Sequence, residues 1–172
     1  DTGKRGYRDL HFEARISRLV GGEAATICNN NAAAIFLILN TLAPGKNVLV
    51  SRGELIEIGG SFRLPTIMER SSALLKEVGT TNKTRISDYR QAIDEKTAII
   101  LRIHPSNYKI LGFTQRPRLE ELVELSNNFK IPLVEDVGSG LLFPSNLLAL
   151  QEEPSVLSSL SKGVNLICFS GD

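Results

Sequence analysis

The stretch Ile131-Pro-Leu-Val-Glu-Asp-Val-Gly-Ser-Gly140 decides the fold of this chain. Its apolar first half is followed at once by two carboxylates and two glycines. A short, continuously apolar run is typical of a strand that is covered on both faces in a parallel sheet, and we predict a strand over residues 131–135. Because ligands of such folds bind at the carboxyl ends of the strands, the polar residues after this strand are candidates for a site.

The same pattern recurs along the whole chain. Five further strands are predicted, over residues 25–28, 47–50, 73–78, 98–103 and 165–169. Longer amphipathic stretches predict helices over residues 10–20, 31–42, 87–93, 117–130 and 154–162. This alternation predicts an α/β fold, either doubly wound or with three αβα layers, built on a mainly parallel sheet.

Composition excludes several classes of protein. Of the 172 residues, 42% are hydrophobic and 23% are charged, which fits one folded domain and excludes wholesale disorder. Twenty basic against nineteen acidic residues leave a formal charge of +1, so charge does not indicate a nucleic-acid binder. The two cysteines, Cys28 and Cys168, exclude a disulfide scaffold, and nothing has metal-ligand spacing. We expect a cytoplasmic protein with two buried thiols.

The residues Asn29-Asn30-Asn31-Ala32 lie between a predicted strand and a predicted helix. A helix start has unpaired N–H groups and the positive end of the helix dipole, so one interpretation is a phosphate site. The alternative is an Asn that caps the helix, with two polar loop neighbours. The sequence leaves both open, because the glycine-rich phosphate fingerprints are absent.

Glu135 and Asp136 close the strand quoted above. Side chains alternate along a strand, so we expect only one of the two to point into a site. A carboxylate there could pair with a cationic ring nitrogen and keep it protonated, while the alternative is an Asp that caps the turn. His104, after another predicted strand, is interpreted as structural.

Near the start of the chain, Arg5 and Arg8 flank a glycine. Guanidinium groups suit phosphate or another oxyanion. The alternative is a solvated basic segment that leads into the first helix, and the sequence favours neither.

Seven segments together resemble bacterial selenocysteine synthases, the L-seryl-tRNA(Sec) selenium transferases. They are Gly-Lys-Arg-Gly (3–6), Asn-Asn-Asn-Ala-Ala-Ala (29–34), Ser-Arg-Gly-Glu-Leu-Ile-Glu-Ile-Gly-Gly-Ser-Phe-Arg (51–63), Glu-Val-Gly-Thr-Thr-Asn-Lys-Thr (77–84), Ser-Asn-Tyr (106–108), Glu-Asp-Val-Gly-Ser-Gly (135–140) and Phe-Ser-Gly-Asp (169–172). The resemblance covers the whole chain in order, and the 51–63 and 77–84 segments are the most specific.

The resemblance implies the large domain of a pyridoxal-phosphate (PLP) transferase of fold type I, the aspartate-aminotransferase type. It implies that Asn29, Asn30, Asn31 and Ala32 hold the cofactor phosphate and that Asp136 pairs with the pyridine nitrogen. Ser139 would reach the phenolic oxygen or the phosphate. Asp172 would lie beside the family's Schiff-base lysine, whose position would be 173, so we expect that the chain as printed cannot make this bond.

The implied reaction converts seryl-tRNA(Sec) to selenocysteyl-tRNA(Sec) through a dehydroalanyl intermediate, with selenophosphate as the selenium donor. Arg5 and Arg8 are candidates for holding the oxyanion, in this chain's own site or in that of a partner subunit, because sites in this fold type lie between subunits. We expect a homo-oligomer. Residues 1–172 would form an incomplete large domain, without the N-terminal tRNA-binding domain and the C-terminal small domain.

Two other functions are compatible with the shorter motifs. One is a related PLP lyase or desulfurase that acts on a small amino-acid substrate. The other is a phosphate-binding α/β module without catalytic activity, which would need neither Asp136 nor a following lysine.

Overall fold

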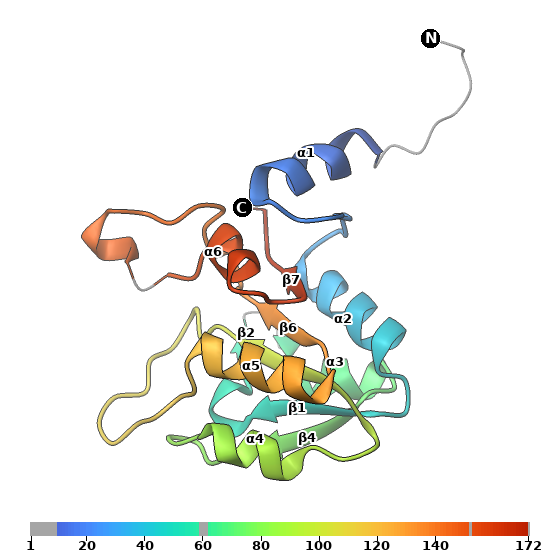
Figure 1. Cartoon of the computed structure of the whole chain (residues 1–172), viewed down its shortest axis with the longest axis vertical. Helices are drawn as coiled ribbons and strands as arrows, with labels where there is room; N and C mark the ends of the chain where they lie inside the picture. The colour runs from blue at the N-terminus through green and yellow to red at the C-terminus, as the bar shows by residue number, and fades with distance from the viewer. Residues whose placement is uncertain (1–9, 59–61, 152, 172) are drawn as a thin grey trace.

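The computed structural model describes residues 10–58, 62–151 and 153–171, and its centre is a five-stranded sheet (Figure 1). The strand order is β4 (Leu74–Val78), β1 (Asn47–Ser51), β5 (Thr97–Ile103), β6 (Leu133–Asp136) and β7 (Leu166–Cys168). Every neighbouring pair in this sheet is parallel. The prediction of a parallel α/β sheet is therefore confirmed.

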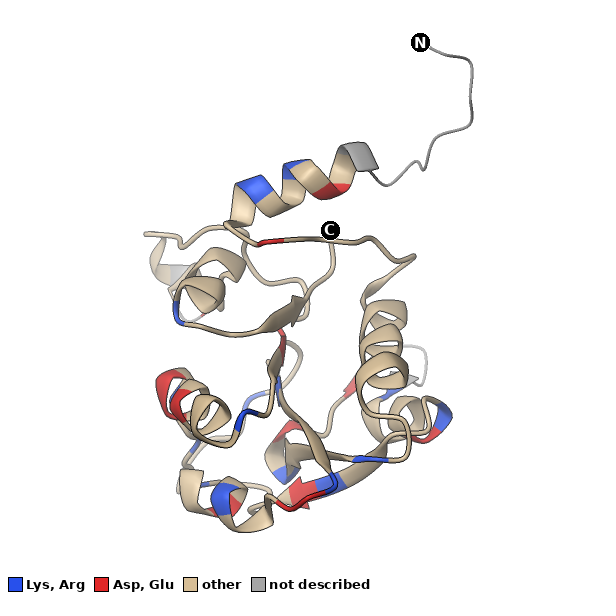
Figure 2. Ribbon diagram, turned by 45° about the vertical axis from the view of Figure 1, so that its right-hand side comes forward, with Lys and Arg blue, Asp and Glu red and all other residues tan. Residues whose placement is uncertain are grey.

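Helices cover both faces of the sheet, as Figure 2 shows in a turned view. On one face, α2 (Asn31–Leu42) and α3 (Leu64–Arg70) pack against alternate strand residues such as Val50, Leu101 and Val134. On the other face, α4 (Ile86–Ala92) and α5 (Leu119–Phe129) pack against the intervening residues, such as Leu49 and Leu133. Three layers result because each strand is apolar on both of its faces.

A third, smaller apolar cluster lies beyond the end of the sheet. It joins α1 (Leu10–Val20), α6 (Val156–Ser161) and the turn after β6 through the buried side chains of Val20, Val156 and Val137. In Figure 1, α1 lies above α6 and β7. The cluster fixes the turn that follows Asp136.

The remaining elements are short. β2 (Glu57–Ile58) and β3 (Phe62–Arg63) form a separate antiparallel pair, and η1 (Arg52–Glu54) and η2 (Leu148–Leu150) are single 3₁₀ turns. Among the described residues, no helix has the length and apolarity that a bilayer crossing requires.

Local signals explain where α2 begins and ends. The Asn30 side chain accepts a hydrogen bond from the Ala33 amide (2.8 Å), which is the N-cap geometry. The helix ends one residue before Ala43-Pro44-Gly45, where Gly45 has a φ of 69°. The predicted bounds of this helix are confirmed.

The prediction of a strand over residues 25–28 is wrong. No residue of this segment joins a sheet in the described part of the chain, and its side chains are half-buried or exposed. A strand needs a neighbour for its backbone N–H and C=O groups, and the apolar pattern carries no information about the neighbour. For the same reason Cys28 is half-buried and not buried as expected, whereas Cys168, on β7, is buried.

Candidate functional site

Asn31 and Asp136 meet at the carboxyl edge of the sheet. Asp136 is the last residue of β6 and is 6% exposed, and Asn31 is the first residue of α2. The Asn31 Nδ2 atom donates a hydrogen bond of 2.7 Å to Asp136 Oδ1, across 105 positions of the chain. The end of β6 and the start of α2, which the sequence indicates as two separate candidates, thus form one site.

Glu135 and Asp136 lie on opposite faces of β6, as the alternation of side chains predicts. Asp136 faces the α2 side, while Glu135 lies opposite Arg102 of β5, and its Oε1 atom is 3.3 Å from Arg102 Nε. Only Asp136 therefore contributes to the edge at which α2 begins.

The turn after β6 holds the Asp136 carboxylate from the other side. The Gly138 amide donates a second hydrogen bond to Asp136 Oδ1 (3.0 Å). Gly138 has a φ of 63° and Gly140 a φ of 51°, a region that favours glycine. The Ser170 amide donates to the Gly138 carbonyl (2.7 Å) and ties this turn to the segment after β7.

The Asn29–Ala32 candidates lie where the sequence placed them, at the start of α2, but their side chains differ in role. Asn30 caps the helix, which was one of the two interpretations, and Asn31 contacts Asp136. Asn29 is exposed and Ala32 is half-buried. Within the described residues, the backbone amides of Asn31 and Ala32 donate no hydrogen bond, so two N–H groups remain for an anion.

Burial dominates the electrostatics of Asp136. It raises the pKa of the carboxyl group above its ordinary value, while the Gly138 amide, the Asn31 side chain and nearby His104 act in the opposite direction. A cation placed against this carboxylate would lower the raised pKa, because opposite charges stabilise each other. The site is therefore suited to a cationic partner.

The other candidate residues have different surroundings. Ser139 is exposed on the turn. His104 follows β5 and its Nε2 atom is 3.2 Å from Glu153 Oε2; burial is the main cause that lowers the pKa of His104. Arg5, Arg8 and Asp172 lie outside the described residues, so their roles stay predictions.

The sequence did not reveal an ion pair between a buried carboxylate, Glu54, and a partly exposed Arg116. Glu54 is 3% exposed; its Oε1 atom is 2.6 Å from Arg116 Nη2, and its Oε2 atom accepts from the Ile103 amide (3.0 Å). Tyr108 adds a hydrogen bond from its hydroxyl to the Gly53 carbonyl. Together they bind the turn after β1 to the end of β5. In the sequence, only the Ser-Arg-Gly-Glu segment at 51–54 hinted at this ion pair.

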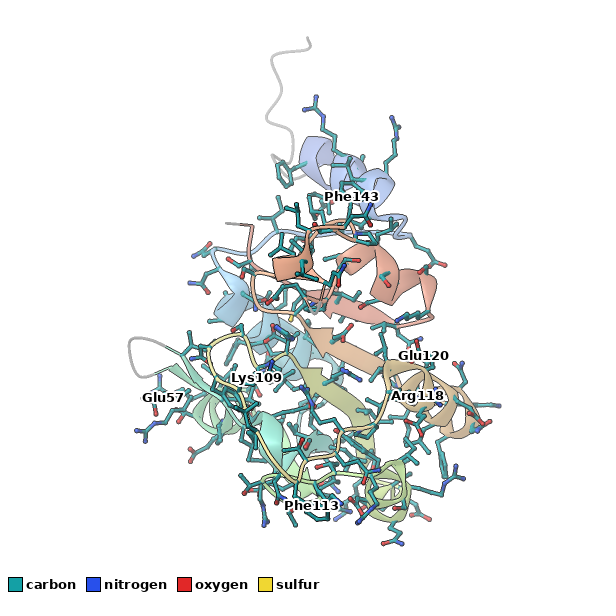
Figure 3. All side chains as sticks on the ribbon, turned by 90° about the vertical axis from the view of Figure 1, so that its left-hand side faces the viewer. Glu57, Lys109, Phe113, Arg118, Glu120 and Phe143 are labelled. Carbon is teal, nitrogen blue, oxygen red and sulfur yellow. The ribbon has the colours of Figure 1, made fainter. Side chains whose placement is uncertain are left out.

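The loop between β5 and α5 crosses in front of the sheet and carries Lys109 and Phe113, with Arg118 and Glu120 at the start of α5 (Figure 3). Behind this loop lies a cavity of about 830 Å³, which neither Asn31 nor Asp136 lines. Its charged side chains are mostly engaged in ion pairs, among them Lys162 with Glu120. Size alone would favour this cavity, but the chemistry favours the Asp136 edge.

A parallel sheet between two helical layers, with a buried carboxylate at the end of an interior strand, is the architecture of the large domain of fold type I, the aspartate-aminotransferase fold. Solved structures agree with this class. The structure of D-glucosaminate-6-phosphate ammonia-lyase matches with a TM-score of 0.77 at 17% identity, over 96% of this chain and 46% of that one. Alanine aminotransferase from Pyrococcus furiosus matches with a TM-score of 0.59 at 20% identity, over 97% and 44%.

Sequence comparison narrows the class to one family. The model of the L-seryl-tRNA selenium transferase family matches residues 1–172, and the chain belongs to this family. The L-seryl-tRNA(Sec) selenium transferase of Alkaliphilus metalliredigens (strain QYMF) is 53% identical over 171 residues, which are 99% of this chain. The chain spans 37% of the length of that relative.

Proposed function

We propose that this chain is part of a PLP-dependent L-seryl-tRNA(Sec) selenium transferase, which converts seryl-tRNA(Sec) to selenocysteyl-tRNA(Sec) with selenophosphate through a dehydroalanyl intermediate. Membership of the family supports the activity, and the activity for which the Alkaliphilus relative is named supports the tRNA substrate. The observation that carries the proposal is the contact of Asn31 with Asp136, which places an anion-binding helix start beside a buried carboxylate.

The described residues fit PLP. Its ring nitrogen is cationic when protonated and suits the buried carboxylate of Asp136, whose pKa is raised by burial. Its phosphate suits the first-turn amides of α2 and the side chains around Asn29–Ala32. Ser139, exposed on the turn, is the candidate for the phenolic oxygen or the phosphate. When bound, PLP supplies an electron sink for charge that develops at the substrate α-carbon.

The chain's own residues then have distinct roles. Asp136 keeps the ring nitrogen protonated, because its charge is held in a site of low water content. The glycine turn 138–140 would let a planar ligand lie close to the backbone. Arg5 and Arg8 would hold the oxyanion of the selenium donor, in this chain's site or in a partner subunit's, and Asp172 would lie beside the lysine that carries the cofactor in this family.

We place residues 1–172 in the large PLP-binding domain of a longer protein with an N-terminal tRNA-binding domain and a C-terminal small domain. The 37% span of the relatives' length supports this arrangement. The formal charge of +1 is close to zero, which fits a domain that does not bind the tRNA itself, so that another part of the protein binds it. We further propose a cytoplasmic homo-oligomer with sites between subunits.

The test uses the full-length protein, purified with PLP, and seryl-tRNA(Sec) with radioactive selenophosphate. We expect selenium to appear on the tRNA and the Asp136→Ala variant to lose this transfer. Serine supplied as the free amino acid should not react. Consumption of free serine without any labelling of tRNA would replace the proposal with a small-substrate lyase.

A further inference from the structure

We propose that Asn31 is a positioning residue: it holds one oxygen of the Asp136 carboxylate so that the other faces the ring nitrogen of the bound cofactor. The inference rests on the proposed function, since it assigns a role within the same site. It separates Asn31 from its neighbours Asn29 and Asn30, which belong to the phosphate end of the site.

Both hydrogen bonds to the carboxylate go to the same atom. Asn31 Nδ2 and the Gly138 amide donate to Asp136 Oδ1, at 2.7 Å and 3.0 Å. Among the described residues, no donor contacts Asp136 Oδ2. The terminal torsion of an aspartate is otherwise soft, so two donors on one oxygen set the plane of the carboxylate and leave the second oxygen for a partner.

The two donors come from independent parts of the fold. The Gly138 amide belongs to the turn directly after β6, and it would be present in any chain with this turn. Asn31 reaches across from the first residue of α2, which is anchored on the sheet by buried Ile35 and Leu39. The position of the carboxylate is therefore fixed relative to the helix start, where the phosphate of the same cofactor would bind.

The orientation of Asn31 supports a functional role. Its Nδ2 atom faces Asp136, so its Oδ1 atom is turned away, is buried and has no partner among the described residues. A buried amide oxygen without a partner costs free energy, and a first-turn Asn could avoid this cost by turning its side chain to solvent. The contact with Asp136 is kept despite the cost.

The electrostatics of Asp136 also support a positioning role for Asn31. Burial raises the pKa of Asp136, and the Asn31 donor opposes this because it stabilises only the charged form. Among the described residues, the other titratable groups that act on or are affected by this carboxylate are His104, which also lowers its pKa, and Cys168, whose own pKa is raised mainly by burial. Loss of the Asn31 donor therefore leaves a carboxylate that is protonated more readily and pairs less strongly with the ring.

The experiment compares full-length wild type with Asn31→Ala and Asn31→Leu. Asn31→Leu has a side chain of similar size but no hydrogen-bond donor. Asn127→Ala is the matched control, because Asn127 is an exposed residue of α5 outside the proposed site. Two properties are measured without turnover: the dissociation constant of PLP, and the ¹⁵N chemical shift of the ring nitrogen of bound, ¹⁵N-labelled PLP as the pH is raised.

We expect PLP binding to weaken about tenfold in Asn31→Ala, the effect of one lost hydrogen bond to a charged group. In both Asn31 variants the ring nitrogen should lose its proton at lower pH than in wild type, and Asn127→Ala should titrate like wild type. Should Asn31→Ala not fold, Asn31→Leu carries the comparison. Wild-type titration in the Asn31 variants would overturn the role of Asn31. If the wild type itself binds no PLP, the proposed function fails instead.

Discussion

The side-chain amide of Asn31, at the start of α2, donates a 2.7 Å hydrogen bond to the carboxylate of Asp136, at the end of β6. This contact joins two residues that lie 105 positions apart and makes one site of two sequence motifs. Four predictions follow from the surroundings of this pair and from the core that supports it.

Replacing Asp136 with Asn should separate catalysis from stability. Transfer activity of the full-length protein should fall about a hundredfold or more, because the ring nitrogen loses its ionised partner. Without PLP, Asp136→Asn should melt at a higher temperature than wild type at neutral pH. The raised pKa means that the contribution of Asp136 to stability is present at acidic pH and is lost as the pH rises through that pKa.

Melting temperatures measured without PLP across the acidic-to-neutral range check the second part. The wild type should lose stability relative to Asp136→Asn as the pH increases. A difference that is constant with pH would show that Asp136 does not titrate abnormally in the folded protein.

Replacing Glu135 with Gln should affect stability but not cofactor binding. Glu135 is buried on the opposite face of β6, beside Arg102, and does not face α2. Removal of its charge leaves Arg102 without its partner and should cost about 1–3 kcal/mol in urea denaturation. The PLP dissociation constant should stay within about twofold of wild type. Weakened binding comparable to that of Asp136→Asn would place Glu135 in the site.

Replacing Glu54 with Ala should destabilise the fold. Its buried carboxylate accepts from the Ile103 amide and from Arg116, so its removal leaves a buried backbone donor without a partner, while Arg116 is partly exposed and still donates to the Ile103 carbonyl. We expect a loss of about 1–3 kcal/mol in the free energy of unfolding. Glu57→Ala is the matched control, since that carboxylate pairs with Arg63 on the surface and should contribute about 1 kcal/mol or less. Equal effects would contradict the assignment.

Replacing Gly140 with Ala tests the tightness of the turn after Asp136. Gly140 has a φ of 51°, and an added Cβ would lie 2.8 Å from Val137 Cγ2. Gly45→Ala is the control, because Gly45 has a φ of 69° but no atom within 4 Å of an added Cβ. We expect about 1 kcal/mol of destabilisation for Gly45→Ala and about 2–4 kcal/mol for Gly140→Ala. Comparable melting temperatures for the two variants would show that the turn adapts.

Much of the layer structure was predictable from short patterns. The 47–50, 73–78, 98–103, 131–135 and 165–169 runs each form a strand of the parallel sheet, because a strand covered on both faces must be apolar throughout. The 25–28 run has the same pattern and forms no strand in the described residues. An apolar pattern indicates that a segment can be buried. A strand also requires a neighbouring strand that pairs with its backbone N–H and C=O groups.

At the site, the three consecutive asparagines also show what the sequence predicts and what it does not. The sequence does not distinguish Asn29, Asn30 and Asn31 from one another. The side chains of successive residues at a helix start, however, point in different directions. Asn30 therefore turns back to the helix amides and Asn31 turns toward β6. The Glu54–Arg116 pair was beyond prediction, because nothing local indicates that a loop carboxylate is buried against a cation 62 positions away.

The sequence by itself determined the family of this protein and its order of strands and helices, because motif spacing and hydrophobic runs are local properties of the chain. Only the tertiary structure decided which asparagine holds Asp136, which carboxylate of β6 faces α2, and which apolar run stays outside the sheet. These outcomes depend on side-chain direction and on contacts between distant segments, which exist only once the sheet and helices have packed.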